Sequence, residues 1–589
     1  MNPFPALGDF LRYLESVGEL RRIRVEVDPK LEITEIATRA LKANMPALLF
    51  EHVKGARFPL AVNVYASAKR IELALGRHPE QIGEELIEFA EQLMPPRPRA
   101  LWKHRRLIAR AVSSRPRTTT RGISQEVLSA CTLDDLPIQK CWPGDGGRFI
   151  TLGQVITNDP LDGKRNIGIY RMHVYDSRTT GMHWQIQKGG GFHYHRAEQM
   201  NQDLEVAVAL GTDPAGLLAS VAALPEGIDE ALFAGFLRGK SLGFVRGRSV
   251  KLFVPSGAEF ILEGVVRRIE RKTEGPFGDH FGHYSHAAAF PVFHLNTITH
   301  RGGAVYPGTV VGIPPMEDRF LGDATQQILG PLVRLLHKEV REVWAYYEAG
   351  FHNLLVVSVE ERYHKEAMKA ALGLLGTGQL SLTKCLILVS EDVDPRNWNA
   401  VLGSVRDHFD SHFDFVLLPK VPLDTLDFTS FEMELGSKMI LDATAKRKRV
   451  LKARKSRKPD ARDIKAVDRR ILDVAIIEDT FALVKVRGAG REIVKKLVRS
   501  KSTNTASIVA VVSEDVDIHD AANAIWGVFT RFDCERDVVF SNQELMGISP
   551  VYRGTMGIDA TWKKGYPDPL RMDERIAKKV DSRWGDYWN

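Results

Sequence analysis

The spacing of hydrophobic and polar positions predicts an α/β unit at the start of the chain. Apolar residues recur at helical intervals in two segments, and short apolar or alternating runs typical of strands lie between and after them. The unit ends where closely spaced prolines at 95–99 stop regular structure. The predicted helices are 7–17 and 32–43, and the predicted strands are 22–27, 47–50 and 60–63.

From about residue 121 to about residue 320, the pattern changes to short strands separated by glycine and proline turns. A strand-dense segment with few long helical patterns favours a β-barrel or a sandwich. The exception is 197–210, where we predict a helix inserted between strands. The clearest predicted strands are 149–152, 167–171, 242–245, 250–254 and 290–294.

A repeat follows residue 321. Cys385-Leu-Ile-Leu-Val-Ser-Glu-Asp-Val-Asp394 recurs as Ser507-Ile-Val-Ala-Val-Val-Ser-Glu-Asp-Val-Asp517, and two further segments recur in the same order. Three collinear matches indicate two copies of one unit, at about 353–446 and 480–563. Because a helical pattern separates the strand patterns in each copy, we predict parallel strands in both.

Together these patterns predict an α/β (α+β) fold in several domains. With 589 residues and 44% hydrophobic content, the chain can bury more than one core. The predicted parts are an N-terminal α/β domain with its connector at 1–120, a central β-barrel at 121–320, a first C-terminal α/β copy at 321–446, a basic linker at 447–479, and a second α/β copy with a tail at 480–589.

Composition and charge narrow the function classes. The chain has no run of eighteen apolar residues, no signal-peptide pattern and only four scattered cysteines, so we expect a cytoplasmic protein without a transmembrane segment. The net charge is +7, yet residues 446–470 hold thirteen Lys/Arg and three Asp, or +10, which leaves 7 − 10 = −3 for the rest. We interpret this segment as a solvated linker rather than a nucleic-acid site, because no aromatic residues interleave with its charges.

The turn from Glu274 to Asp279 is the main candidate for chemistry. Gly275, Pro276 and Gly278 stiffen it, so both carboxylates can face one cavity. Two acids in a shared apolar site have their pKa values pushed apart, which lets one ionise while the other carries a proton. The alternative interpretation is a surface turn with two solvated acids.

Other polar residues could contribute to a site. The fork of donors on Arg171 suits a carboxylate or a phosphate, or else pairs with a neighbouring strand. The glycine-rich stretch 188–191 could approach a phosphate closely, although it is not a Walker A sequence. A hard metal bound by the oxygen atoms of Asn166 and Glu230 is chemically natural beside such a phosphate.

Three histidines at regular spacing raise the alternative of zinc. His280, His283 and His286 lack the HExxH context of a catalytic zinc helix, and they follow a glycine-proline turn. We therefore interpret His280 as a wall of the pocket rather than as a metal ligand.

The chain resembles the UbiD family of prenylated-flavin-dependent decarboxylases over nearly its whole length. The resemblance implies that the central part is a split β-barrel that binds flavin. It rests on segments in all parts of the chain: Gly18–Ile23, Val27–Ile36, Pro46–Glu51, Leu136–Pro143, Asp145–Thr151, Asn166–Arg171, Glu274–Asp279, Gly312–Pro315 and the two Ser-Glu-Asp-Val-Asp segments.

Roles for individual residues follow from this resemblance. Arg171, Glu274 and Asp279 match the family's catalytic network, with Asp279 at the proton donor. Asn166 and Glu230 match the ligands of the metal that holds the cofactor phosphate. The cofactor-binding residues implied in this way are Asn166, Ile169, Tyr170, Arg171, His183, Trp184, Gln185, Lys188, Gly189 and Glu230.

Two details of this implied site depend on the chain itself. Family members often have a histidine metal ligand where this chain has Gln187, so either Gln187 or His193 is expected to complete the metal site. A neighbouring Arg171 would lower the pKa of Asp279, whereas burial raises it. We therefore expect Arg171 to pair with Glu274 and to leave Asp279 free and protonated.

The resemblance implies reversible, non-oxidative decarboxylation of an aromatic or α,β-unsaturated acid, in quinone biosynthesis or aromatic acid metabolism. The cofactors expected are prenylated FMN and Mn²⁺ or another divalent cation, with K⁺ as a further candidate. The partners expected are the acid, a flavin prenyltransferase of the UbiX type as cofactor supplier, and other copies of the chain in a dimer or hexamer, but no nucleic acid.

Two alternative functions stay open at this point. One is a catalytically reduced UbiD-like subunit of a decarboxylase or carboxylase that is built from several subunits, and the other is a zinc-dependent hydrolase. Of the two C-terminal copies, we expect one to serve the active site and the other the interface between subunits.

Overall fold

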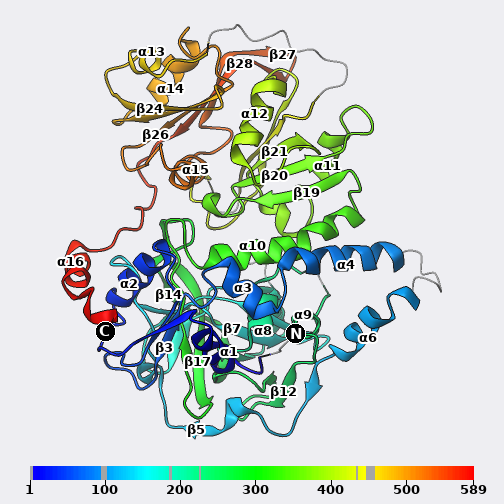
Figure 1. Ribbon diagram of the computed structural model, residues 1–589, viewed down its shortest axis with the longest axis vertical. Coiled ribbons are helices and arrows are strands. Elements are labelled where there is room, and N and C mark those ends of the chain that lie inside the picture. Colours follow the sequence, from blue (N-terminus) through cyan, green and yellow to red (C-terminus); the bar gives the residue numbers. More distant parts are fainter. Residues whose placement is uncertain are drawn as a thin grey trace. The chain divides into compact units, whose positions relative to one another are not determined.

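The computed structural model describes residues 4–93, 102–184, 189–224, 227–430, 432, 435–445 and 458–588. The chain forms two compact units (Figure 1), Met1–Leu329 with Asp568–Asn589, and Gly330–Pro567. The tail belongs to the first unit, because α16 (Glu574–Arg583) carries Lys579 and Arg583, whose nitrogens each lie 2.7 Å from the buried carboxylate of Glu32. No helix in the described part of the chain combines the length and the apolar character that crossing a bilayer needs.

A four-stranded sheet in the order β1-β2-β3-β18 begins the first unit. The predicted helices are confirmed as α1 (Leu7–Ser16) and α2 (Glu32–Lys42). The strand predicted at 22–27 is wrong in position, because the paired residues are those between the buried Leu20 and Ile23. The strands are β1 (Leu20–Ile23), β2 (Ala47–Phe50), β3 (Leu60–Val62) and β18 (Tyr306–Pro307).

A nine-stranded antiparallel sheet forms the centre of the first unit and confirms the prediction of many short strands in this part of the chain. Its order is β6-β9-β10-β17-β14-β11-β7-β8, with β5 paired to β17. The strands are β5 (Val127–Ser129), β6 (Arg148–Ile150), β7 (Gln154–Asn158), β8 (Arg165–Ile169), β9 (Met172–Val174), β10 (Thr179–Gly181), β11 (Leu204–Leu210), β14 (Phe260–Glu274) and β17 (Ala288–His300).

The helix predicted over 197–210 is wrong except for its first three residues. The helix α7 (Gly189–Gln199) ends early, and 204–210 is the strand β11, which pairs with both β7 and β14. Leu204 and the run from Val206 to Leu210 are buried, so apolar spacing in this segment suited a helix and a central strand equally well. The segment is a strand because it pairs with a neighbouring strand on each side.

The remaining helices of the first unit bury their apolar faces in one core with the sheet. For example, Leu218 and Phe236 lie in the same cluster as Ile156 and Ala207 of the sheet. The other elements are α3 (Ala68–Leu75), α4 (Pro79–Leu93), α6 (Arg105–Ser113), α8 (Pro214–Val221), α9 (Glu230–Arg238), α10 (Asp318–Leu329), β4 (Arg117–Thr118), β12 (Gly243–Arg246), β13 (Phe253–Pro255), β15 (Phe277–Gly278) and β16 (Tyr284–Ser285).

In the second unit, two five-stranded sheets have the same strand order. The first runs β19-β20-β21-β23-β22 and the second β24-β25-β26-β28-β27. The predicted parallel pairing is confirmed in both, and an antiparallel strand closes each edge. The strands are β19 (Val340–Ala345), β20 (Leu354–Val359), β21 (Cys385–Ser390), β22 (Phe415–Pro422), β23 (Leu435–Asp442), β24 (Ile471–Ile477), β25 (Phe481–Val486), β26 (Ile508–Val512), β27 (Val538–Met546) and β28 (Ser549–Ala560).

Helices connect the parallel strands at equivalent places in the two sheets, α11 (Glu366–Leu374) and α12 (Trp398–His408) in the first, α14 (Gly490–Arg499) and α15 (Ala521–Phe529) in the second. The two copies also contact each other, as when the hydroxyl of Ser437 donates to Asp533 over 2.9 Å. All four cysteines of the chain are buried and free.

Candidate active site

Arg171 lies at the centre of a buried network in the first unit. It occupies the short connection between β8 and β9, while Glu274 ends β14. The Arg171 Nε atom donates to Glu274 Oε1 over 2.8 Å, and Nη2 donates to Oε2 over 3.1 Å. Its third nitrogen, Nη1, donates to Asp279, and Nη2 also reaches the Ser285 hydroxyl at 3.0 Å. The guanidinium thus joins both candidate acids.

The turn that carries the two acids is held from both sides. The Gly278 amide donates to Asp145 over 2.7 Å, and the Gly146 amide donates to the carbonyl of Pro276 over 2.7 Å. A Cβ atom on Gly278 would lie 2.2 Å from the indole ring of Trp142, so this position excludes any side chain. The stiffness predicted for this turn therefore has a tertiary cause as well as a local one.

Both acids are buried in this network. Burial by itself raises the pKa of Glu274, but the hydrogen bond from His183 and the charge of Arg171 outweigh it and lower the pKa to about 2. Burial likewise raises the pKa of Asp279, and the hydrogen bond and charge of His280, together with Arg171, hold that pKa well below its ordinary range. Both groups are therefore carboxylates in this state of the molecule.

The prediction for Arg171 is thus half wrong. It pairs with Glu274 as expected, but Asp279 is not left free, since Arg171 contacts one of its oxygens and His280 the other, the latter with Nδ1 at 2.6 Å. The alternative of a surface turn with solvated acids is wrong as well, because Glu274 is fully buried and Asp279 nearly so. His280 contacts the acid itself and is more than a wall of the pocket.

His183 is a contact of the network whose partner the sequence did not reveal. Its Nδ1 atom lies 3.1 Å from Glu274 Oε2, on the segment after β10. Burial and the charge of Arg171 lower the pKa of His183, so a neutral ring that donates to Glu274 fits this place. No pattern in the chain links these two positions, because strands far apart in sequence bring them together.

A second group of candidate residues surrounds the start of α7. Asn166 lies in β8, and Glu230 begins α9 and accepts the Ile167 amide over 3.2 Å. Burial raises the pKa of Glu230 to about 7. The Gly190 amide donates to the hydroxyl of Tyr170 over 3.1 Å. Asn166 therefore belongs to the strand that leads to Arg171, and Glu230 contacts the same strand.

Features of this second group fit a bound polar cofactor. The Asn166 side-chain nitrogen and the Trp184 indole nitrogen are buried without a hydrogen-bond partner in the described part of the chain. A Cβ atom on Gly189 would lie 2.2 Å from Asn166 Oδ1, and one on Gly190 would lie 2.7 Å from Trp184 Nε1. Buried polar groups without partners are costly unless a ligand satisfies them. We call Asn166, Tyr170, Trp184, Gly189, Gly190 and Glu230 the cradle.

Some predicted ligands have other surroundings or lie outside the described residues. Gln185, Gln187 and Lys188 are outside them. His193 is buried on α7, with Nδ1 2.8 Å from the hydroxyl of Thr157 and Nε2 3.9 Å from Asp159. Ile169 packs beside the core of the sheet.

Among the described residues, no group of three or more His, Cys, Asp or Glu can hold a metal ion, which removes the support for a zinc site at His280, His283 and His286.

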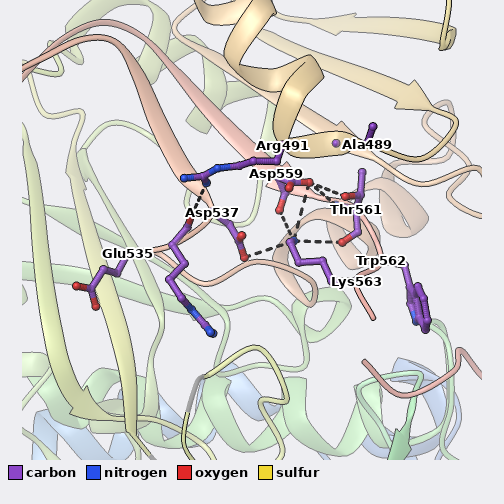
Figure 2. A pocket seen from close by; sticks show the side chains of 10 residues that line it. Ala489, Arg491, Glu535, Asp537, Asp559, Thr561, Trp562 and Lys563 are labelled. Carbon is purple, nitrogen blue, oxygen red and sulfur yellow. Dashed lines mark hydrogen bonds and ion pairs between the residues drawn. The ribbon is translucent and has the colours of Figure 1, made fainter. Parts of the chain in front are cut away.

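A separate pocket of about 640 Å³ lies in the second copy of the second unit. Figure 2 shows Lys563 between Asp537 and Asp559, and its ammonium lies 3.4 Å from the Asp537 carboxylate and donates to the Asp559 carbonyl over 2.8 Å. In the first copy, Lys365 contacts the equivalent Asp442 at 3.3 Å. In each copy, the lysine is therefore paired with a carboxylate of the same copy. The pocket is lined by Ala489, Gly490, Arg491, Glu535, Arg536, Asp537, Asp559, Thr561, Trp562 and Lys563.

Three family models match consecutive parts of the chain. They describe the N-terminal domain (residues 11–90), the Rift-related domain (116–314) and the C-terminal domain (319–443 and 457–560) of 3-octaprenyl-4-hydroxybenzoate carboxy-lyase. These are carboxy-lyase domains, which defines the class of enzyme. The chain belongs to the UbiD family of decarboxylases, and the resemblance seen in the sequence is confirmed.

Individual relatives agree with this assignment. A Chlamydia pneumoniae protein, named as one subunit of a 4-hydroxybenzoate decarboxylase, is 34% identical over 577 residues, which are 97% of each chain. The closed form of vanillic acid decarboxylase from Sedimentibacter hydroxybenzoicus is similar with a TM-score of 0.68 and 27% identity, over 78% of this chain and 96% of that one. An evolved dimeric form of HmfF from Pelotomaculum thermopropionicum, in complex with prFMN, is similar with a TM-score of 0.62 and 26% identity, over 76% and 97%.

Proposed function

We propose that this chain catalyses the reversible, non-oxidative decarboxylation of a hydroxylated aromatic acid with prenylated FMN as cofactor. The observation that carries the proposal is the buried Arg171–Glu274–Asp279 network, in which Arg171 follows the strand that bears the cradle residue Asn166. The relatives named for 4-hydroxybenzoate and for vanillic acid support a phenolic acid as substrate. Quinone biosynthesis or aromatic acid metabolism is the setting we infer.

The cradle would hold the cofactor and its metal. Asn166 and Glu230 offer an amide and a carboxylate oxygen, ligands suited to Mn²⁺ or another hard cation, with K⁺ as a further candidate. Burial raises the pKa of Glu230, and a bound cation would lower it again by stabilising the carboxylate. When bound, prenylated FMN supplies the electron sink that no side chain offers. A flavin prenyltransferase would supply it.

In the proposed reaction, Asp279 returns a proton to the carbon that has lost CO₂. Arg171 holds Glu274 by two nitrogens and Asp279 by a third, so it can release Asp279 and still hold Glu274. Loss of that one contact raises the pKa of Asp279, because burial then acts with less opposition. His280, on the other oxygen, is part of a path by which Asp279 regains its proton.

A second candidate is one component of a decarboxylase built from several different subunits. The name of the Chlamydia pneumoniae relative, which designates one subunit, favours further subunits. The complete Arg171–Glu274–Asp279 network favours a catalytic subunit over a catalytically reduced one. We also propose self-association into a dimer or hexamer, in which one C-terminal copy serves the interface.

The test is co-expression with a flavin prenyltransferase, followed by an absorbance spectrum and CO₂ release from 4-hydroxybenzoate, vanillate and 3,4-dihydroxybenzoate. We expect a bound flavin, a divalent cation and turnover of at least one acid. In D₂O, deuterium should appear at the carbon that lost CO₂. A purified protein that binds no flavin contradicts the proposal, and bound flavin without turnover favours the reduced subunit.

A further inference from the structure

The two acids of the active site are supported by different parts of the fold. Glu274 ends β14, a long strand of the nine-stranded sheet, and Arg171 lies between two strands of the same sheet. Asp279 instead follows β15, which forms with β16 a separate sheet of two strands, each two residues long. A hairpin of this size is marginally stable by itself. The position of Asp279 therefore depends on further contacts.

The C-terminal tail of the chain supplies such contacts. The Leu570 amide donates to the Gly282 carbonyl over 2.9 Å, and the Tyr284 amide donates to the Asp568 carbonyl over 3.2 Å. The residues between these partners pair as an antiparallel bridge. Residues 568–570 thus add a third strand to the hairpin of β15 and β16, and we call them the tail strand.

The tail strand and Asp279 contact neighbouring carbonyl groups of one segment. The Asp279 amide donates to the His283 carbonyl over 3.0 Å, and the Gly282 amide donates to the Asp279 carbonyl over 2.9 Å. The carbonyl of Gly282 faces the tail strand, whereas the next carbonyl, that of His283, faces Asp279. The segment that closes the turn is therefore held between Asp279 and the tail strand.

Leu570 also packs against the turn with its side chain. This side chain is only 3% exposed. A Cβ atom on Gly278 would lie 2.9 Å from Leu570 Cδ2 and 2.2 Å from the Trp142 ring. Since Gly278 directly precedes Asp279, the leucine and the tryptophan together fill the space against the backbone that carries the acid. Removal of the leucine side chain would leave a cavity at this place.

The tail has a second anchor that does not involve Leu570. On α16 and just after it, Lys579, Arg583 and the hydroxyl of Tyr587 all contact the buried carboxylate of Glu32, at 2.7, 2.7 and 2.8 Å. These contacts hold the tail to α2. A change at Leu570 should therefore loosen the turn without releasing the tail from the first unit.

We propose that Leu570 is a positioning residue of the active site, which sets the distance between Asp279 and the carbon that loses CO₂. The inference rests on the proposed function and extends it, because it makes the chain segment after the second copy part of the proton-return step. Since Glu274 and Arg171 are held by the nine-stranded sheet, loosening of the tail strand should displace Asp279 alone. Binding of flavin and of substrate should then be independent of Leu570.

The test compares Leu570→Ala and Leu570→Met with the parent, each as the full chain co-expressed with a flavin prenyltransferase. The substrate is whichever of 4-hydroxybenzoate, vanillate and 3,4-dihydroxybenzoate the parent turns over. A misplacement of about 1 Å can lower a rate about 100-fold, so kcat of Leu570→Ala should fall by about 10- to 100-fold. KM and the flavin absorbance should change by less than about twofold. Leu570→Met conserves the volume and should keep kcat within about threefold of the parent value.

Hydrogen exchange gives a measurement that needs neither flavin nor substrate. Peptides that cover residues 277–285 should exchange about tenfold faster in Leu570→Ala than in the parent, because the pairing with the tail strand is weakened. In Leu570→Met, they should exchange as in the parent.

Leu252 provides the matched control. It is likewise 3% exposed, and it packs in the core of the first unit. Leu252→Ala removes the same atoms as Leu570→Ala, so it should also lower the melting temperature. It should leave kcat and the exchange of residues 277–285 unchanged.

Three outcomes would overturn the proposal. One is a parental kcat in Leu570→Ala, which would reduce the tail strand to a structural role. Another is an equal loss of kcat in Leu252→Ala, and the third is loss of the flavin from Leu570→Ala. If the parent turns over none of the three acids, the proposed function fails and hydrogen exchange decides. Unchanged exchange of residues 277–285 in Leu570→Ala would then overturn the proposal, and faster exchange would support the positioning of the turn by the tail strand.

Discussion

Replacement of Arg171 by methionine should destabilise the strands around it, and the structure gives the size of the effect. Glu274 has a pKa of about 2 in place of its ordinary 4.5. A difference of this size corresponds to roughly 3 kcal/mol of stability, which is the upper limit for Arg171, because the hydrogen bond from His183 contributes to the same lowering. Methionine keeps much of the side-chain volume against Phe277, whose ring centroid lies 4.8 Å from the guanidinium, but it leaves the Glu274 charge buried.

The sign of the pH dependence follows from the lowered pKa. A carboxylate with a lowered folded-state pKa contributes stability that is present above its ordinary pKa of about 4.5. That contribution is lost as the pH falls from 4.5 towards 2. The gap between parent and Arg171→Met should therefore be widest near neutral pH and narrow in acid, where Glu274 is protonated in the variant.

Hydrogen exchange followed by mass spectrometry is the suitable assay, because the two units of the chain need not unfold together. The upper limit of about 3 kcal/mol corresponds to exchange that is faster by up to about 150-fold in peptides that cover β8 and β14. The double variant Arg171→Met/Glu274→Gln removes both charges and should recover more than half of the loss. The exposed Arg178 serves as the control position. An effect below fivefold, or an equal one from Arg178→Met, would refute the reasoning.

Three further predictions concern the cradle and the turn. Asp279→Asn should abolish CO₂ release and solvent deuterium incorporation yet keep the flavin absorbance, whereas cofactor loss would contradict its assignment as proton donor. Glu230→Gln should lower the bound divalent metal, measured by elemental analysis, more than tenfold, since one anionic ligand is removed; unchanged metal content would count against the cradle. Gly278→Ala should cost about 2–4 kcal/mol and lower the melting temperature, because its Cβ would lie 2.2 Å from the Trp142 ring, and an unchanged melting temperature would contradict this.

Local patterns were informative where they agreed with the tertiary environment. The helices over 7–17 and 32–43 were predictable because their apolar stripes are long and periodic. The repeat in the sequence corresponds to two sheets of one strand order, since the recurring segments include β21 and β26, the central strands. Both sheets also begin with an edge strand, at 340–345 and 471–477, where the copies have diverged and no match was visible.

The sequence by itself determined the order of α/β and strand-rich parts, the identity of the candidate acids and the family. These depend on residue types and on spacing along the chain. Only the tertiary structure decided that 204–210 is a strand, that His183 contacts Glu274 and that Arg171 also contacts Asp279. Such contacts join residues up to 108 positions apart, and their strength depends on burial, which strand pairing creates and local sequence does not encode.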